Sequence, residues 1–70
     1  MLVVIIYARD YESNAKSLKS AIKEEWTDVK VNLLGTLKTL YQIQLDKDII
    51  YSDDATETNT NIINAIKERL

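Results

Sequence analysis

Hydrophobic positions at the start of the chain form one unbroken run, Leu2-Val3-Val4-Ile5-Ile6-Tyr7. The run is rich in β-branched residues and shows no alternation with polar ones. This pattern is typical of a central strand that is covered on both faces, as in the parallel sheets of α/β folds. We therefore expect the first element to be a buried strand.

The period of the pattern then changes from that of a strand to that of a helix. Asp10 is a candidate N-cap, and Glu12 places a negative charge in the first turn. The apolar positions that recur at helical spacing are Tyr11, Ala15, Leu18, Ile22 and Trp26. The sequence predicts an amphipathic helix of roughly four turns.

Strand-like alternation returns after this helix. Apolar residues at 29, 31 and 33 alternate with Lys30 and Asn32, and the single glycine, Gly35, is expected to end that strand. A strand, a crossover helix and a second strand predict a parallel pair. A third strand is expected over 41–45, then a tight loop at Asp46-Lys47-Asp48 and a short returning strand at Ile49-Ile50-Tyr51.

The last segment predicts a second helix. Asp54, followed three residues later by Glu57, resembles a capping box. The helix face that follows consists of Ala55, Asn59, Ile62, Ile63, Ile66 and Leu70. We therefore expect residues 1–70 to form one domain of order β-α-β-β-β-α, an α/β (α+β) fold. We expect its four-stranded mixed sheet to have the strand order 2-1-3-4.

Composition excludes several kinds of chemistry. With no cysteine and no histidine the chain performs no thiol, zinc-thiolate or imidazole chemistry, and a serine or threonine nucleophile has no histidine base. One glycine is too few for a phosphate-binding loop. Asp53, Asp54 and Glu57 fall short of a calcium loop. We therefore expect neither metal nor cofactor.

Net charge and hydropathy limit the kinds of partner that we expect the protein to bind. The net charge is −2, and the basic residues are mixed with acidic ones along the chain, so no basic patch indicates nucleic-acid binding. The opening apolar run is too short for a membrane span, and no basic leader precedes it. We expect a cytoplasmic protein whose partner is another protein.

The turn after the first strand carries the candidate binding residues, which are Tyr7, Arg9, Asp10 and Tyr11. Backbone N–H groups and the positive end of the helix dipole converge at such a turn. Two aromatic side chains and an arginine could bind a partner peptide or an anion. In the alternative interpretation, Asp10 caps the helix, Tyr11 packs beneath it and Arg9 is simply solvated.

At this turn the chain resembles the thioredoxin-like selenoprotein W group. That group has an apolar first strand ending near a tyrosine, here Val3 to Tyr7, and a hairpin strand similar to Tyr41-Gln42-Ile43-Gln44-Leu45-Asp46. Its C-x-x-C or C-x-x-Sec motif is absent, because Ala8 and Tyr11 occupy the two redox positions. The resemblance therefore implies a thioredoxin-like fold without redox activity, and it transfers no catalytic residue.

A second candidate surface lies at the edge of the sheet. Strict alternation would turn Ile50 to the side opposite Ile49 and Tyr51, where it could bind another chain, including a second copy. Leu34, Leu37 and Leu40 add apolar surface nearby. The function we expect is a non-catalytic protein-interaction module. The alternative is a small-ligand or enzyme-accessory protein that uses the turn.

Overall fold

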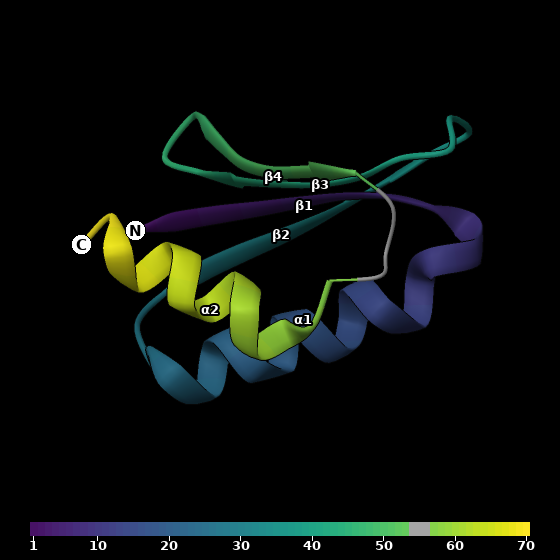
Figure 1. The fold of residues 1–70 in the computed structure, drawn as a ribbon. Coiled ribbons are helices and arrows are strands. Elements are labelled where there is room, and N and C mark those ends of the chain that lie inside the picture. Colours follow the sequence, from purple (N-terminus) through teal and green to yellow (C-terminus); the bar gives the residue numbers. More distant parts are fainter. Residues whose placement is uncertain (54–56) are drawn as a thin grey trace.

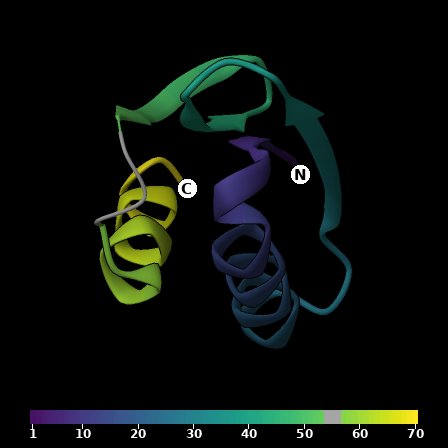
Figure 2. The same cartoon turned by 90° about the vertical axis from the view of Figure 1, so that its right-hand side faces the viewer.

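The computed structural model describes residues 1–53 and 57–70. Four strands and two helices form two layers (Figure 1; Figure 2). The sheet contains β1 (Leu2–Ala8), β2 (Lys30–Thr36), β3 (Tyr41–Leu45) and β4 (Asp48–Asp53), in the order β2-β1-β3-β4. β1 is parallel to β2 and antiparallel to β3, and β3 is antiparallel to β4. The mixed sheet and its strand order are those expected from the sequence.

The core lies between the sheet and the two helices, α1 (Glu12–Glu25) and α2 (Asn59–Glu68). Strand alternation sends Val3 and Ile5 into it, and both are fully buried. The helices contribute the apolar residues of their inner faces, which are Ala15, Leu18, Ile22, Ile62 and Ile66. Trp26, at the C-cap of α1, packs against this core and donates its backbone N–H to the carbonyl oxygen of Ile22.

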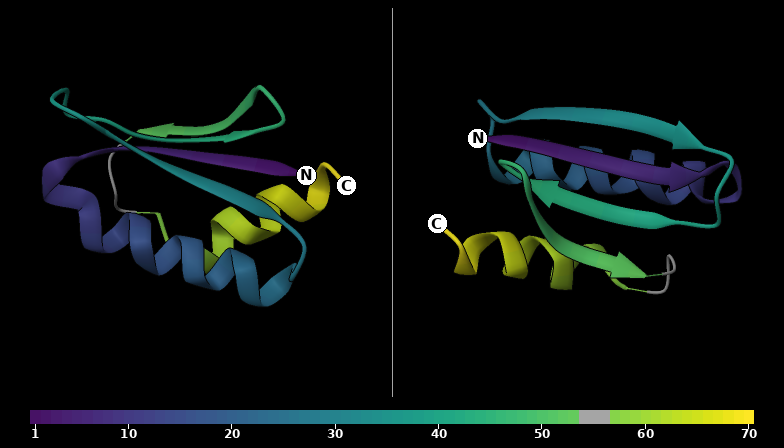
Figure 3. Two further views of the ribbon diagram at one scale, coloured as in Figure 1. Left: turned by 180° about the vertical axis from the view of Figure 1, so that it is seen from behind. Right: turned by 90° about the horizontal axis from the view of Figure 1, so that it is seen from above.

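Both helices cover the same face of the sheet (Figure 1; Figure 3, left). The expectation that β1 is covered on both faces is therefore wrong. Val4 and Ile6, which point away from the helices, are only partly buried. A continuous apolar run shows that both sides of a strand are apolar, but it does not show that the same chain supplies both covers.

The first helix begins later than predicted. Arg9–Tyr11 form a short 3₁₀ helix (η1), and α1 starts at Glu12. No side chain caps η1 or α1, so the role assigned to Asp10 as N-cap is wrong. At the other end of the βαβ unit, β2 continues through Gly35 to Thr36, so Gly35 does not end the strand.

The hairpin and the second helix also differ in detail from the prediction. The loop contains two residues, Asp46 and Lys47, both with positive φ, and Asp48 already belongs to β4. Such a two-residue turn matches the twist of antiparallel strands. Asp54, the predicted cap of the second helix, lies outside the described residues. The helix begins at Asn59, and the Thr58 side chain accepts a hydrogen bond from the backbone N–H of Asn61.

The returning strand β4 contains a β-bulge. Ile43 pairs with Tyr51 and the next residue, Gln44, pairs with Ile49, so Ile50 is an extra residue without an opposite partner. The bulge interrupts the alternation, and Ile50 packs against the core with Tyr51. The expected outward orientation of Ile50 is therefore wrong, and Ile49 is the exposed apolar residue of this strand.

Candidate functional site

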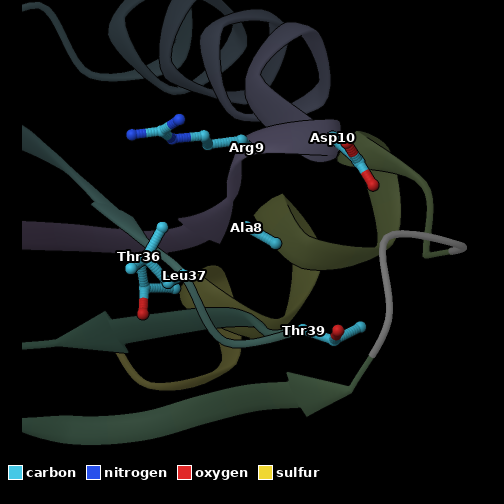
Figure 4. Close-up of a pocket in the computed structure, with 6 residues that line it drawn as sticks. All are labelled: Ala8, Arg9, Asp10, Thr36, Leu37 and Thr39. Atoms are coloured by element: carbon cyan, nitrogen blue, oxygen red, sulfur yellow. The ribbon is translucent and has the colours of Figure 1, made fainter.

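A shallow cavity lies at the end of β1, where the chain turns into η1 and α1 (Figure 4). Its volume is about 170 Å³. The residues that line it are Ala8, Arg9, Asp10, Thr36, Leu37 and Thr39. We call this cavity the turn pocket.

Two segments form the walls of the turn pocket. Arg9 and Asp10, from η1, lie on one side, and the β2–β3 loop lies on the other, with Ala8 between them (Figure 4). The loop comes close because β1 and β2 are parallel and in register to their last residues, Ala8 and Thr36. Parallel strands bring their carboxyl ends to the same edge of a sheet, where binding sites commonly form.

Hydrogen bonds hold these walls in place. The backbone N–H of Ala8 donates to the carbonyl oxygen of Leu40 at 2.8 Å, which ties the floor of the pocket to the end of the loop. Within the loop, the backbone N–H of Lys38 donates to the Thr36 hydroxyl at 3.2 Å. The pocket is therefore a preformed feature of the backbone.

The chemical character of the turn pocket is mixed. Ala8 supplies an apolar, nearly buried floor, whereas Leu37 is 88% exposed at the rim. The side chains of Arg9 and Asp10 are exposed and point in opposite directions (Figure 4). The site thus offers an apolar centre, two threonine hydroxyl groups and one charge of each sign, and the N-terminal end of the helix adds a partial positive charge.

The structure separates the predicted site residues into two groups. Arg9 and Asp10 line the turn pocket, as the candidate site requires. Tyr7 and Tyr11 do not line it, because both pack against the core. The Tyr7 ring lies beside Gly35, where an added Cβ atom would be 3.8 Å from the ring. Ile50 lies on β4 and packs against the core as well.

Tyr11 belongs to an aromatic cluster beneath the helix. Its ring meets that of Tyr41 edge-on, with centroids 6.1 Å apart, and Tyr41 meets Tyr51 in the same way at 6.4 Å. Such edge-to-face pairs stabilise a core beyond their buried area. Burial raises the pKa of Tyr41 from 10 to about 12, and the neighbouring Tyr51 adds to the effect. Of the two interpretations of Tyr11, packing beneath the helix is confirmed.

Sequence reasoning missed the far wall of the turn pocket, at Thr36, Leu37 and Thr39. The signal for it was present. Two parallel strands that end in register predict that the residues after the second strand lie beside the turn after the first. The sequence predicts an apolar surface at residues 34, 37 and 40, but the hydrophobic pattern alone does not place it beside Arg9.

The described residues include neither a cluster of metal-ligating side chains nor a helix that could span a membrane. Within residues 1–53 and 57–70 no group of three or more acidic side chains is placed to hold a metal ion. In the same part of the chain, neither helix has the length and apolar character needed to span a bilayer. A comparison of this chain with protein-family models and with curated protein sequences finds no match.

Proposed function

We propose that this protein is a non-catalytic interaction module that binds a short segment of another protein at the turn pocket. The observation that carries the proposal is the size and make-up of that pocket. Sites for small molecules and cofactors have volumes of roughly 300–1,000 Å³. A preformed hollow of about 170 Å³ instead suits a single side chain of a partner.

The rim of the pocket supports a protein partner. Leu37 is an almost fully exposed apolar side chain on a loop whose backbone is hydrogen-bonded in place. Across the pocket, Arg9 supplies a flexible cation with an apolar stem. An apolar residue and an arginine around a small hollow resemble the centre of a protein interface, where a few such residues contribute most of the binding energy.

Kinship with the selenoprotein W group is part of the proposal. The element order and the two-layer arrangement support it, and Ala8 at the floor of the turn pocket stands where the resemblance puts the first redox residue. Without sulfur at Ala8 or Tyr11, the inherited property would be the geometry of a binding surface and not a reaction. We also propose a cytoplasmic location, in line with the absence of cysteine.

A peptide-display experiment tests this function. A library of random peptides is selected on the immobilised protein and, as a baseline, on the double variant Arg9→Ala/Leu37→Ser. We expect peptides enriched only on the unmodified protein, with at least tenfold weaker binding to Leu37→Ser alone. Leu70→Ser, which changes an exposed leucine at the C-terminal end of the chain, is the matched control and should bind normally.

Two results would contradict the proposal. Equal enrichment on the protein and on the double variant would show that the turn pocket does not select peptides. Turnover of a disulfide or peroxide by the purified protein would show that it is an enzyme. In an NMR titration with an enriched peptide, amide shifts should be confined to residues 8–10 and 36–39.

A further inference from the structure

The face of the sheet opposite the helices has no covering layer in the described chain (Figure 3, left). We call it the open face. Val3 and Ile5 point into the core, so Val4 and Ile6 point to the open face, where each remains partly exposed. These two residues lie on β1, an interior strand of the sheet.

Strand pairing extends this apolar surface to both sides. Ile6 pairs with Leu34 of β2, which is 53% exposed, and Val4 pairs with Gln44 of β3. Gln44 in turn pairs with Ile49 of β4, which is 54% exposed. Paired residues share a face of a sheet. Leu34 and Ile49 therefore lie on the open face with Val4 and Ile6.

A comparison of β1 with β3 shows that the open face is not simply a solvated surface. β3 alternates in the way expected of a one-sided sheet, with a buried apolar residue at every second position and Gln42 and Gln44 on the open face. The two amides are hydrogen-bonded to each other at 2.8 Å. β1 instead has apolar residues on both faces. The pattern of β1 is that of a strand between two layers.

We propose that the second layer is another copy of this chain, bound open face to open face. The open face carries two apolar residues of β1 (Val4 and Ile6), one of β2 (Leu34) and one of β4 (Ile49), whereas Asn32 of β2 and the linked amides of β3 are its polar part. A two-fold axis running across the strands places each strand over its own counterpart. The apolar open-face residues of β1 then lie over β1 of the partner, and the amides of β3 lie over β3 of the partner, as an interface between identical surfaces requires. Stacked sheets commonly align their strands within about 30°.

Charge on the open face permits this pairing. Of the described strand residues that the register places there, only Lys30 is charged, and it lies at the start of the outer strand β2. Two copies can therefore approach without burying like charges. A copy of the chain is also a partner that is always present. Domains this small bury only about 60% of their unfolded surface, and this one has no cysteine for a disulfide.

The dimensions of the molecule limit the area that the dimer can bury. The molecule measures 30 × 20 × 19 Å, so its open face is at most about 600 Å² per copy. Two such faces bury at most about 1,200 Å² in total, which is the lower limit for specific interfaces. We therefore expect a reversible dimer with a dissociation constant in the micromolar range.

Sedimentation equilibrium between about 5 μM and 1 mM tests the proposal. The unmodified protein should pass from monomer to dimer over this range. Leu34→Lys, an exposed position on an outer strand, should weaken the dimer at least tenfold, and Ile49→Lys should act similarly. Leu70→Lys is the matched control for an added lysine and should dimerise normally. Circular dichroism at low concentration checks that the variants are folded.

A monomer at 1 mM, or a dimer that Leu34→Lys and Ile49→Lys leave unchanged, would overturn the proposal. Its failure would not affect the proposed peptide binding, because the pocket residues tested there, Arg9 and Leu37, lie outside the strands of the sheet. Arg9→Ala should leave the dimer intact, and Leu34→Lys should leave peptide binding intact. If one variant abolished both properties, the two surfaces would not be independent and the open-face assignment would be wrong.

Discussion

Tyr41, a residue of the core, makes the stability of the folded protein depend on pH in the alkaline range. Its ring is 1% exposed, and burial together with Tyr51 raises its pKa from 10 to about 12. In the unfolded chain the phenol loses its proton near pH 10, whereas in the folded protein it keeps it to about pH 12. Below pH 10 this effect is fully stabilising, and the stabilisation is lost as the pH rises from 10 to 12.

We therefore expect the free energy of unfolding to fall by about 2–3 kcal/mol across this interval because of Tyr41 alone. Urea denaturation at several pH values, for the protein and for Tyr41→Phe, measures the difference. The phenylalanine variant should have a flatter alkaline limb. Identical slopes for the two proteins would show that Tyr41 is not the group responsible.

At Lys47, the backbone conformation determines how a substitution changes the stability of the protein. Lys47 occupies the hairpin turn with φ 82°, a conformation that glycine adopts without strain and lysine does not. Lys47→Gly should stabilise the protein by about 0.5–1 kcal/mol, since glycine's greater freedom in the unfolded chain offsets part of the gain. Lys47→Ala removes the side chain beyond Cβ but keeps the Cβ atom that causes the strain, so thermal denaturation should show no such increase in its stability.

At the scale of elements, the β-bulge in β4 reverses the roles of two neighbouring isoleucines. Ile50 packs against the core, whereas Ile49 is 54% exposed. Ile50→Thr should lower the free energy of unfolding by about 1–2 kcal/mol, and Ile49→Thr should change it by less than about 0.5 kcal/mol. The measurement belongs below 5 μM protein, where the proposed dimer is dissociated. Equal losses would show that the bulge is misplaced.

The elements themselves were largely predictable from hydrophobic periodicity. The change from a continuous apolar run to a period of 3.6 residues located α1, and the alternations at Val31 and Ile43 located β2 and β3. The bulge was not predictable, because Ile49-Ile50-Tyr51 is apolar throughout and carries no mark of which residue is extra. The start of α2 was missed because Asp54, followed by Glu57, is in sequence a stronger capping signal than Thr58, whose side chain caps the helix.

The candidate site was predictable only in part, for a reason of distance along the chain. Arg9 and Asp10 lie within the turn that sequence reasoning singled out. Their counterparts across the pocket, Thr36 at the end of β2 and Leu37 in the loop after it, come more than twenty residues later. Only the register of two parallel strands brings them beside Arg9 and Asp10. Tyr7 and Tyr11 were predicted to bind a partner because aromatic side chains are common at interfaces. In the structure both pack against the core.

At the scale of the whole molecule, the proposed dimer couples stability to protein concentration. A partner that binds only the folded state raises the temperature of unfolding as its concentration rises. A hundredfold increase in protein should raise the melting temperature by several degrees, and Leu34→Lys should reduce the increase while Leu70→Lys retains it. Differential scanning calorimetry at several concentrations makes the comparison.

The position of Trp26 also determines how these experiments can be followed by fluorescence. It is the single tryptophan of the chain, and it packs against the core at the C-terminal end of α1. The turn pocket is at the other end of that 14-residue helix, about 20 Å away. Intrinsic emission will therefore respond when the fold is lost and stay constant when a peptide occupies the pocket. Titrations of the pocket consequently require an added label, for which the β2–β3 loop is the natural place.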